Sequence, residues 1–122
     1  MIDKDKLNIA FRQMRHAGLV ARQNFSCCGS CAGYELTTNI VAMPNKKRAN
    51  VKGVCFYHRQ DAERLNRGGD LYLGFGPVES TEYGQIGLET VQVGRLVVRA
   101  LALAGLAYEW DGTASQRILV KA

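Results

Sequence analysis

The sequence predicts an α+β fold in which two main helices pack on one face of a mostly antiparallel sheet of about four strands. Apolar residues recur with a helical period over residues 3–21 and again over residues 91–104. Short runs rich in β-branched and aromatic residues lie between and after these helices, separated by turns that contain Gly and Pro. Helices gathered on one side of an antiparallel sheet bury the apolar faces that this order of elements produces.

The length and composition are those of one globular domain. The chain has 122 residues, of which 47% are hydrophobic and 22% charged, as is ordinary for a globular protein. A chain of this length can bury a core without disulfide bonds or metals. No repeat or linker divides the sequence, so we predict a single domain over residues 1–122.

The cysteines are expected to be reduced. No apolar run reaches the ~18 residues that a membrane span needs, and the charged residues 1–6 lack the apolar region of a secretory signal. We therefore expect no membrane association and a cytoplasmic location, where thiols are kept reduced. The four cysteines then indicate buried thiols, metal ligands or redox chemistry rather than a disulfide framework.

Two helices are predicted in the first third of the chain. The first covers about residues 3–21, and Asp3 or Asp5 can cap its start. Its apolar stripe has helical spacing: Leu7, Ala10, Phe11, Met14 and Ala17. A short second helix over residues 30–42 is predicted from the spacing of Leu36, Ile40 and Met43. The β-branched residues in this segment leave a strand open as the alternative, and Pro44 ends either one.

Two strands are predicted in the middle of the chain, with a short turn of helix between them. Residues 51–58 are rich in β-branched and aromatic side chains, and residues 71–75 show the alternation of a strand. Asp61 is expected to cap the turn of helix, which stops at Gly68-Gly69.

The last part of the chain predicts a long helix and a hairpin. The helix covers about residues 91–104 and ends where Gly105 supplies a left-handed residue. Its predicted apolar face is Leu96, Val97, Ala100, Leu101 and Ala104, and its predicted solvent face is Gln92, Arg95 and Arg99. Residues 106–110 and 117–120 then form two strands joined by the loop 111–115.

Positive charge is concentrated in the first half of the chain. Residues 1–61 hold ten Lys or Arg and four Asp or Glu, whereas residues 62–122 hold six and seven. A basic half can attract nucleic acid, and the loop Lys46-Lys47-Arg48 could hold phosphates. No sequence signature of an RNA- or DNA-binding fold accompanies these residues. Nucleic-acid binding is therefore the weakest of the functional interpretations, and a solvated surface is the expected one.

Three cysteines within five residues, Cys27, Cys28 and Cys31, form the one site-like feature of the sequence. A Cys-x-x-Cys loop can place two thiolates on one metal ion, and zinc takes four such ligands in a tetrahedron. Either Cys55 or His58 could supply the fourth ligand but not both, since residues three apart on a strand point to opposite faces. We predict His58, which lies at the polar end of its strand, and expect Cys55 to pack in the core.

Two other interpretations of the cysteine cluster stay open. If a helix begins near Ser30, its N-terminal amides would stabilise a thiolate at Cys28 or Cys31, as a thiol oxidoreductase or thiol sensor requires. Cys28-Gly29-Ser30-Cys31 is similar in form to the active-site loop of thioredoxin, but no βαβ pattern precedes it. The thiols could instead simply pack, because free cysteine is among the most buried residue types.

Four stretches of the sequence carry a resemblance to a known family. They are residues 21–31 with the Cys27-Cys28-x-x-Cys31 loop, residues 56–61 with Tyr57-His58-Arg59-Gln60-Asp61, residues 71–76, and residues 94–97 through to Glu109-Trp110-Asp111-Gly112. Together they resemble an uncharacterised bacterial family of small cytoplasmic domains of unknown function. The resemblance covers most of the chain from residue 18 onward. It implies a bacterial cytoplasmic protein, and it brings no activity, cofactor or catalytic residue with it.

The leading functional prediction is a small binding or interaction module in which Cys27, Cys28, Cys31 and His58 hold a structural zinc ion. A small thiol oxidoreductase or thiol sensor using the Cys-Gly-Ser-Cys loop is the alternative from a different class. No catalytic residue is predicted, and a protein partner or a homo-oligomer stays open.

Overall fold

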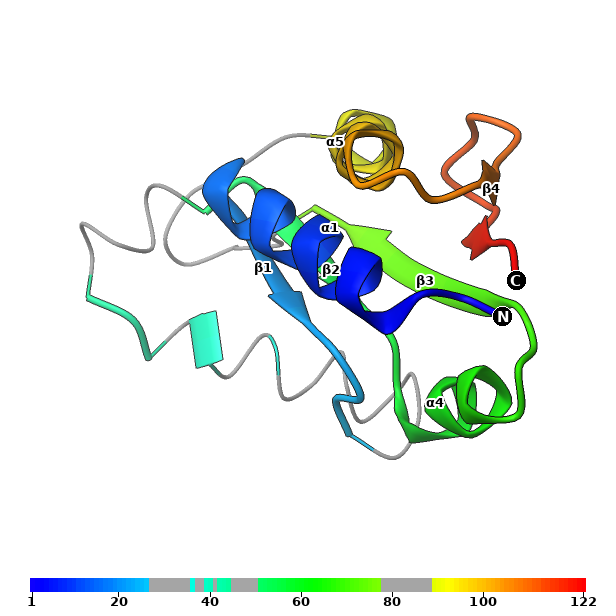
Figure 1. The fold of residues 1–122 in the computed structure, drawn as a ribbon. Helices are drawn as coiled ribbons and strands as arrows, with labels where there is room; N and C mark the ends of the chain where they lie inside the picture. The colour runs from blue at the N-terminus through cyan, green and yellow to red at the C-terminus, as the bar shows by residue number, and fades with distance from the viewer. Residues whose placement is uncertain (27–35, 37–38, 41, 45–50, 78–88) are drawn as a thin grey trace.

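The computed structural model describes residues 1–26, 36, 39–40, 42–44, 51–77 and 89–122. The helices and strands in these ranges follow the chain in the order α1 (Lys4–His16), β1 (Leu19–Arg22), β2 (Gly53–Phe56), α4 (Arg59–Asn66), β3 (Leu71–Gly76), α5 (Thr90–Leu103), β4 (Tyr108–Glu109) and β5 (Ile118–Val120) (Figure 1). None of the helices in these ranges is long and apolar enough to cross a membrane.

The strands form one five-stranded sheet with the order β1-β2-β3-β5-β4. β1 and β2 are parallel, and the other neighbouring pairs are antiparallel. The α+β class and the mostly antiparallel sheet are therefore confirmed, whereas the predicted number of about four strands is one too few. The predicted C-terminal pair of strands is present as β4 and β5, with β4 reduced to two residues.

The additional strand is β1, which the sequence analysis wrongly included in the first helix. α1 is capped by the Asp3 side chain, as expected, but it ends at His16. Gly18 follows with φ of +100°, a left-handed conformation that stops a helix and that glycine adopts without strain. Leu19 and Val20 then extend as a strand, because their branched side chains find buried positions beside β2.

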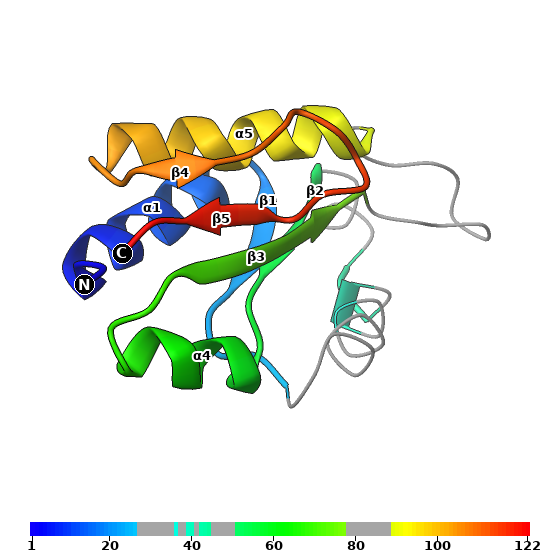
Figure 2. The same ribbon diagram turned by 90° about the vertical axis from the view of Figure 1, so that its right-hand side faces the viewer.

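α1 and α5 lie side by side and cover one face of the sheet (Figure 1), but the prediction of two main helices is one helix short, because α4 also contributes Ala62 and Leu65 to the main core. Their buried faces meet the strand residues that point to the same side: Leu7, Phe11 and Met14 of α1, Val93, Val97 and Leu101 of α5, and Cys55, Leu71, Leu73, Ile118 and Val120 of the sheet. Arg95 and Arg99 are exposed, so the predicted register of the long helix is confirmed. α4 is a third helix, and Figure 2 shows it on the other side of β3 from α5.

A second, smaller apolar cluster lies on the opposite face of the sheet. Its buried members are Val20, Leu36, Ile40 and Val51, and Val54 and Phe56 pack against it. Val20, Val54 and Phe56 alternate along their strands with residues of the main core, which places them on the other face. Leu36, Asn39 and Ile40 have helical backbone. The rest of the predicted helix over residues 30–42, and the basic loop over residues 46–48, lie outside the described residues.

Candidate functional site

His58 stands at the junction between β2 and α4. Its backbone is extended, with φ of −101° and ψ of −178°, and its Nδ1 atom accepts the Asp61 backbone N–H at 3.4 Å. His58 is therefore the residue that caps α4, and the expectation that Asp61 would cap this helix was wrong. Asp61 lies in the first turn instead, where the positive end of the helix dipole favours a carboxylate.

The Asp61 side chain is the buried centre of a polar cluster. Asp61 is only 5% exposed, and its Oδ2 accepts a hydrogen bond from Arg117 Nη2 at 2.7 Å. The same oxygen lies 3.2 Å from His58 Nε2. His58 thus meets Asp61 at two points, through the backbone amide at Nδ1 and through the carboxylate at Nε2. His58 therefore links the carboxylate to the start of α4.

Arg117 reaches this cluster from the beginning of β5. Its Nη2 also donates to the Tyr72 carbonyl oxygen at 3.0 Å, and its guanidinium carbon lies 5.4 Å from the centre of the Tyr72 ring. Arg64 of α4 lies 5.5 Å from the same ring. Sequence reasoning missed Arg117, because its partner Asp61 is 56 residues away and no local pattern joins the two.

An aromatic ring packs on glycine beside the polar cluster. The tip of the Phe56 ring lies against β3 at Gly74, where an added Cβ atom would stand 2.9 Å from Phe56 Cζ. Residue 74 must therefore lack a side chain for the ring to occupy this position. The sequence pattern marked Gly74 only as part of a strand, and the cross-strand contact with β2 explains why glycine is present.

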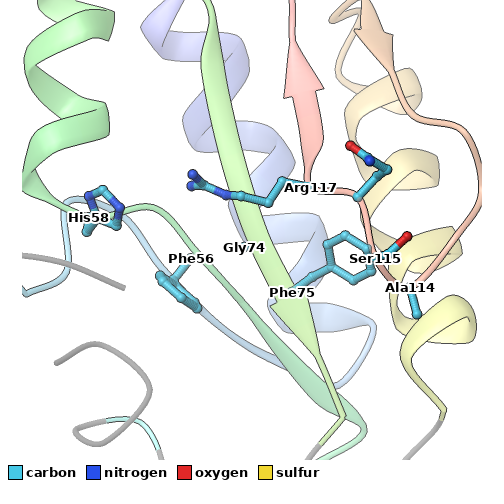
Figure 3. Close-up of a pocket in the computed structure, with 8 residues that line it drawn as sticks. Phe56, His58, Gly74, Phe75, Ala114, Ser115 and Arg117 are labelled. Atoms are coloured by element: carbon cyan, nitrogen blue, oxygen red, sulfur yellow. The ribbon is translucent and has the colours of Figure 1, made fainter. Parts of the chain in front are cut away.

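These groups line a cavity of about 300 Å³ on the outer face of the sheet (Figure 3). Its lining includes Phe56, Gly74, Phe75, His58, Ser115 and Arg117. The Phe75 ring itself packs against Trp110 and lies beside Gly94 of α5. In Figure 3 the Arg117 side chain extends across β3 toward His58, and the Phe56 ring lies below the two.

The predicted zinc ligands are only partly described. Cys27, Cys28 and Cys31 lie outside the described residues, whereas His58 is placed as above. In the part of the chain that the structure describes, no group of three or more His, Cys, Asp or Glu side chains could hold a metal ion. Cys55 is a free thiol that is fully buried in the main core, as expected, and burial raises the pKa of this thiol.

The chain that precedes Cys27 runs alongside the segment that carries His58. The Ser26 carbonyl oxygen accepts the Arg59 backbone N–H at 3.0 Å, and the Phe25 N–H donates to the Tyr57 carbonyl oxygen at 2.9 Å. Asn24 and Ser26 have left-handed φ values of +50° and +67°. This conformation is uncommon for residues other than glycine and costs free energy, so the surrounding contacts must hold it in place.

The fold and the site together define an α+β domain with a mixed five-stranded sheet, a buried carboxylate paired with His58 and Arg117, and an adjoining cavity. The chain belongs to the family described as Domain of unknown function (DUF6891), whose model matches residues 1–122. The resemblance to an uncharacterised family of domains of unknown function is thereby confirmed. Searches of curated proteins and of solved structures gave no significant match.

Proposed function

We propose that the protein is a small cytoplasmic binding module in which Cys27, Cys28, Cys31 and His58 hold a structural zinc ion. One contact carries the proposal: the Ser26 carbonyl oxygen accepts the Arg59 N–H at 3.0 Å. The residue directly before the first cysteine is thus fixed against the residue directly after His58. The chain therefore enters the cysteine segment from a point beside His58, although the two are far apart in the sequence.

The contacts of His58 suit a zinc ligand that binds through Nδ1. The hydrogen bond that Nδ1 accepts from the Asp61 amide is long, at 3.4 Å, so little is lost when it opens. Nε2 then still faces the Asp61 carboxylate at 3.2 Å and can donate its N–H to it. Zinc-bound histidines commonly donate their second N–H to a carboxylate in this way, which fixes the ring and makes it a better ligand.

A site of three thiolates and one imidazole has structural rather than catalytic character. Zinc with four protein ligands in a tetrahedron has no open position for water or substrate. Such a metal ion would instead contribute to the stability of the fold, because its ligands are brought together only in the folded chain. A binding module is the class of protein that this arrangement fits.

Metal analysis of the full chain, purified without chelator, tests the proposal. We expect about one zinc ion per chain, and loss of the ion in Cys31→Ser and in His58→Asn. Asparagine is itself a good helix cap, so His58→Asn spares the start of α4. The matched controls Cys55→Ala and His16→Asn remove a buried thiol and an exposed imidazole and should keep the zinc. A metal-free wild type, or full zinc content in Cys31→Ser, would refute the proposal.

A further inference from the structure

A groove lies between α1 and α5, which run antiparallel along each other (Figure 2). It contains a hollow of about 260 Å³. The described residues that line the hollow all belong to α1, its C-cap residue or α5, so the hollow opens on the side away from the sheet. Ala17 and Ala100 contribute only methyl side chains to it, and the half-buried Leu96 lies beside them. The small side chains at these positions explain why the two helices leave a concave surface.

Two exposed aliphatic side chains border this groove. Leu103 lines it and is 68% exposed, and Ile9, one helical turn before Gln13 on the same side of α1, is 42% exposed. They are two of the four large apolar side chains that the structure leaves exposed in its described residues. Apolar side chains that are grouped on a surface, rather than scattered singly, indicate contact with another molecule.

Positive charge surrounds the apolar part of the groove. Arg99 lines the groove, and Arg12 and Arg95 are exposed one helical turn from its lining residues. Within the described ranges, none of these three guanidinium groups forms an ion pair with a carboxylate. The carboxylates of the two helices lie at their N-terminal ends. The groove therefore combines an apolar hollow with arginines whose charge is not neutralised.

An acidic amphipathic helix is the ligand that matches these properties. Such a helix inserts apolar side chains at positions i, i+3, i+4 and i+7 into a groove, and its carboxylates would lie against the arginines. α1 and α5 have 13 and 14 residues, so each is about 20 Å long at the helical rise of 1.5 Å per residue. A partner helix of three to four turns has the same length as the groove.

Other occupants match the groove less well. A second copy of the chain would bring the same arginines against this face, and like charges oppose that pairing. Single-stranded nucleic acid binds where bases stack on aromatic rings, and no Phe, Tyr or Trp is among the described residues that line the groove. A bilayer surface would contact the exposed Leu103 but leave the hollow beneath it unfilled.

We propose that the groove between α1 and α5 binds an acidic, amphipathic helical segment of a partner protein. Its apolar side chains would enter the hollow beside Leu96 and Leu103, and its carboxylates would contact the surrounding arginines. This inference goes beyond the zinc proposal, because it names the surface through which the module binds. It does not depend on the metal, since no cysteine takes part in the groove.

The test uses a fluorescein-labelled, amidated peptide of about 14 residues, the length of the groove. Its leucines follow the i, i+3, i+4, i+7 pattern, and its other positions are mostly glutamate. Fluorescence anisotropy should show saturable binding to the full chain, and NMR of the ¹⁵N-labelled chain should show amide shifts confined to α1 and α5. A scrambled peptide of the same composition should bind at least about tenfold more weakly. A peptide with lysine in place of glutamate should not bind, and added salt should weaken the acidic peptide.

Two pairs of variants test the placement, all at exposed positions that leave the core intact. Leu103→Gln should weaken binding about tenfold through the lost apolar contact. Ala102→Gln introduces the same side chain at the neighbouring residue, which points away from the groove, and should bind like wild type. Arg99→Gln should weaken binding about threefold and reduce its salt dependence. Arg67→Gln makes the same change in α4, outside the groove, and should have no effect.

The proposal is overturned if the acidic peptide does not bind, if the lysine peptide binds as tightly, or if Leu103→Gln behaves like Ala102→Gln. Sedimentation velocity that shows a dimer broken by Leu103→Gln would also overturn it, because a second copy would then occupy the groove. Binding of DNA or of phosphatidylglycerol vesicles that Leu103→Gln and Arg99→Gln abolish would overturn it in the same way. Zinc content is measured on each sample, so failure of the zinc proposal is recognised separately from failure of peptide binding.

Discussion

The buried carboxylate of Asp61 connects three segments of the chain: α4, the residue before α4 and the residue before β5. A buried charge is costly unless it is paired and hydrogen-bonded. Here the carboxylate is carried by α4 and is paired with Arg117, the residue before β5, and with His58, the residue before α4. The spacing of His58 and Asp61 made their pairing foreseeable from the sequence. The arginine could not be foreseen, because the pairing depends on how β5 lies against β3.

The two partners of the Asp61–Arg117 pair should respond differently to mutation. Arg117→Ala leaves a buried carboxylate without its main partner, and we expect it to lower the free energy of unfolding by about 3 kcal/mol. Asp61→Asn leaves the half-exposed guanidinium to water and should lower it by only about 1.5 kcal/mol. Urea denaturation of both variants and of the double variant measures the coupling. Additive losses in the double variant would contradict a direct interaction.

Gly74 should tolerate no side chain, unlike its neighbour two residues along the strand. An added Cβ at residue 74 meets the Phe56 ring at 2.9 Å, so Gly74→Ala should destabilise the fold by about 1–2 kcal/mol. Gly76→Ala is the matched control, because nothing lies within 4 Å of its added Cβ. Thermal unfolding compares the two. Equal stability of Gly74→Ala and Gly76→Ala would show that the ring position is not fixed.

Tyr57 should make the stability of the fold fall at alkaline pH. Its hydroxyl donates to Gln23 Oε1 at 2.9 Å, its ring meets Phe11 edge-on, and burial raises its pKa to about 12. The neutral phenol is therefore favoured in the folded chain. Its contribution to stability is complete below the ordinary pKa of 10 and is lost as the pH rises through about 12.

Stability measured against pH checks this expectation. Tyr57→Phe should lower stability by about 1 kcal/mol at neutral pH, through the lost hydrogen bond, and should reduce the fall above pH 10. Tyr108→Phe, at an exposed position, should leave both quantities unchanged. A wild-type stability that is flat between pH 10 and about 12 would rule out a phenol titrating in the core.

At the level of elements, local patterns predicted each helix and strand in the described ranges except β1. The apolar period of α1 continues through Ala17, and Leu19 and Val20 fit a further helical turn as well as a strand. Gly18 decides between these two possibilities, because its left-handed φ of +100° ends the helix and lets a strand follow. The strand that follows exists because it pairs with β2 in parallel, a contact between distant parts of the chain that periodicity does not reveal.

α5 carries a glycine that packing requires. Alanine is better than glycine in a helix by about 1 kcal/mol, yet a Cβ at Gly94 would stand 2.6 Å from the Trp110 ring and 2.8 Å from Phe75. We therefore expect Gly94→Ala to lower stability by a net of about 1 kcal/mol, because displaced aromatic rings cost more than the helix gains.

The fluorescence of Trp110, the single tryptophan, distinguishes this cause from a general loss of stability. Gly94→Ala should shift the emission of the folded protein. Gly105→Ala should cost about 1 kcal/mol as well, through its left-handed φ of +81°, but leave the emission unchanged. Unaltered emission in Gly94→Ala would contradict the contact between α5 and Trp110.

For the whole molecule, the sequence predicted the main core better than it predicted the site. The apolar faces of α1 and α5 are local periodic patterns, and burial follows from them. The cluster of His58, Asp61 and Arg117 joins side chains through the sheet order, which composition and spacing do not encode. The cavity above Gly74 was missed for the same reason, since it arises only when β2, β3 and the loop before β5 come together.

The four thiols should react in separate steps if the cysteine cluster holds zinc while Cys55 belongs to the core. Zinc blocks the thiolates that it binds. Cys55 is inaccessible, and the raised pKa of its thiol keeps it protonated. We expect no thiol to be alkylated by iodoacetamide in the untreated protein, three after zinc is removed by a chelator, and all four in denaturant. Mass spectrometry counts the added groups at each step.

Each result that differs from alkylation of none, then three, then four thiols would have a distinct physical meaning. Cys55→Ala should remove one group from the denatured count and leave the first two counts unchanged, because its thiol reacts only when the core opens. Rapid alkylation of the untreated protein would refute the zinc proposal and favour an accessible thiolate, as a thiol oxidoreductase needs. Thiols that stay inert with chelator and react only in denaturant would mean that the cluster packs without metal. Reaction of Cys55 after chelator alone would show that the metal site and the main core unfold together, rather than the core persisting when the zinc ion leaves.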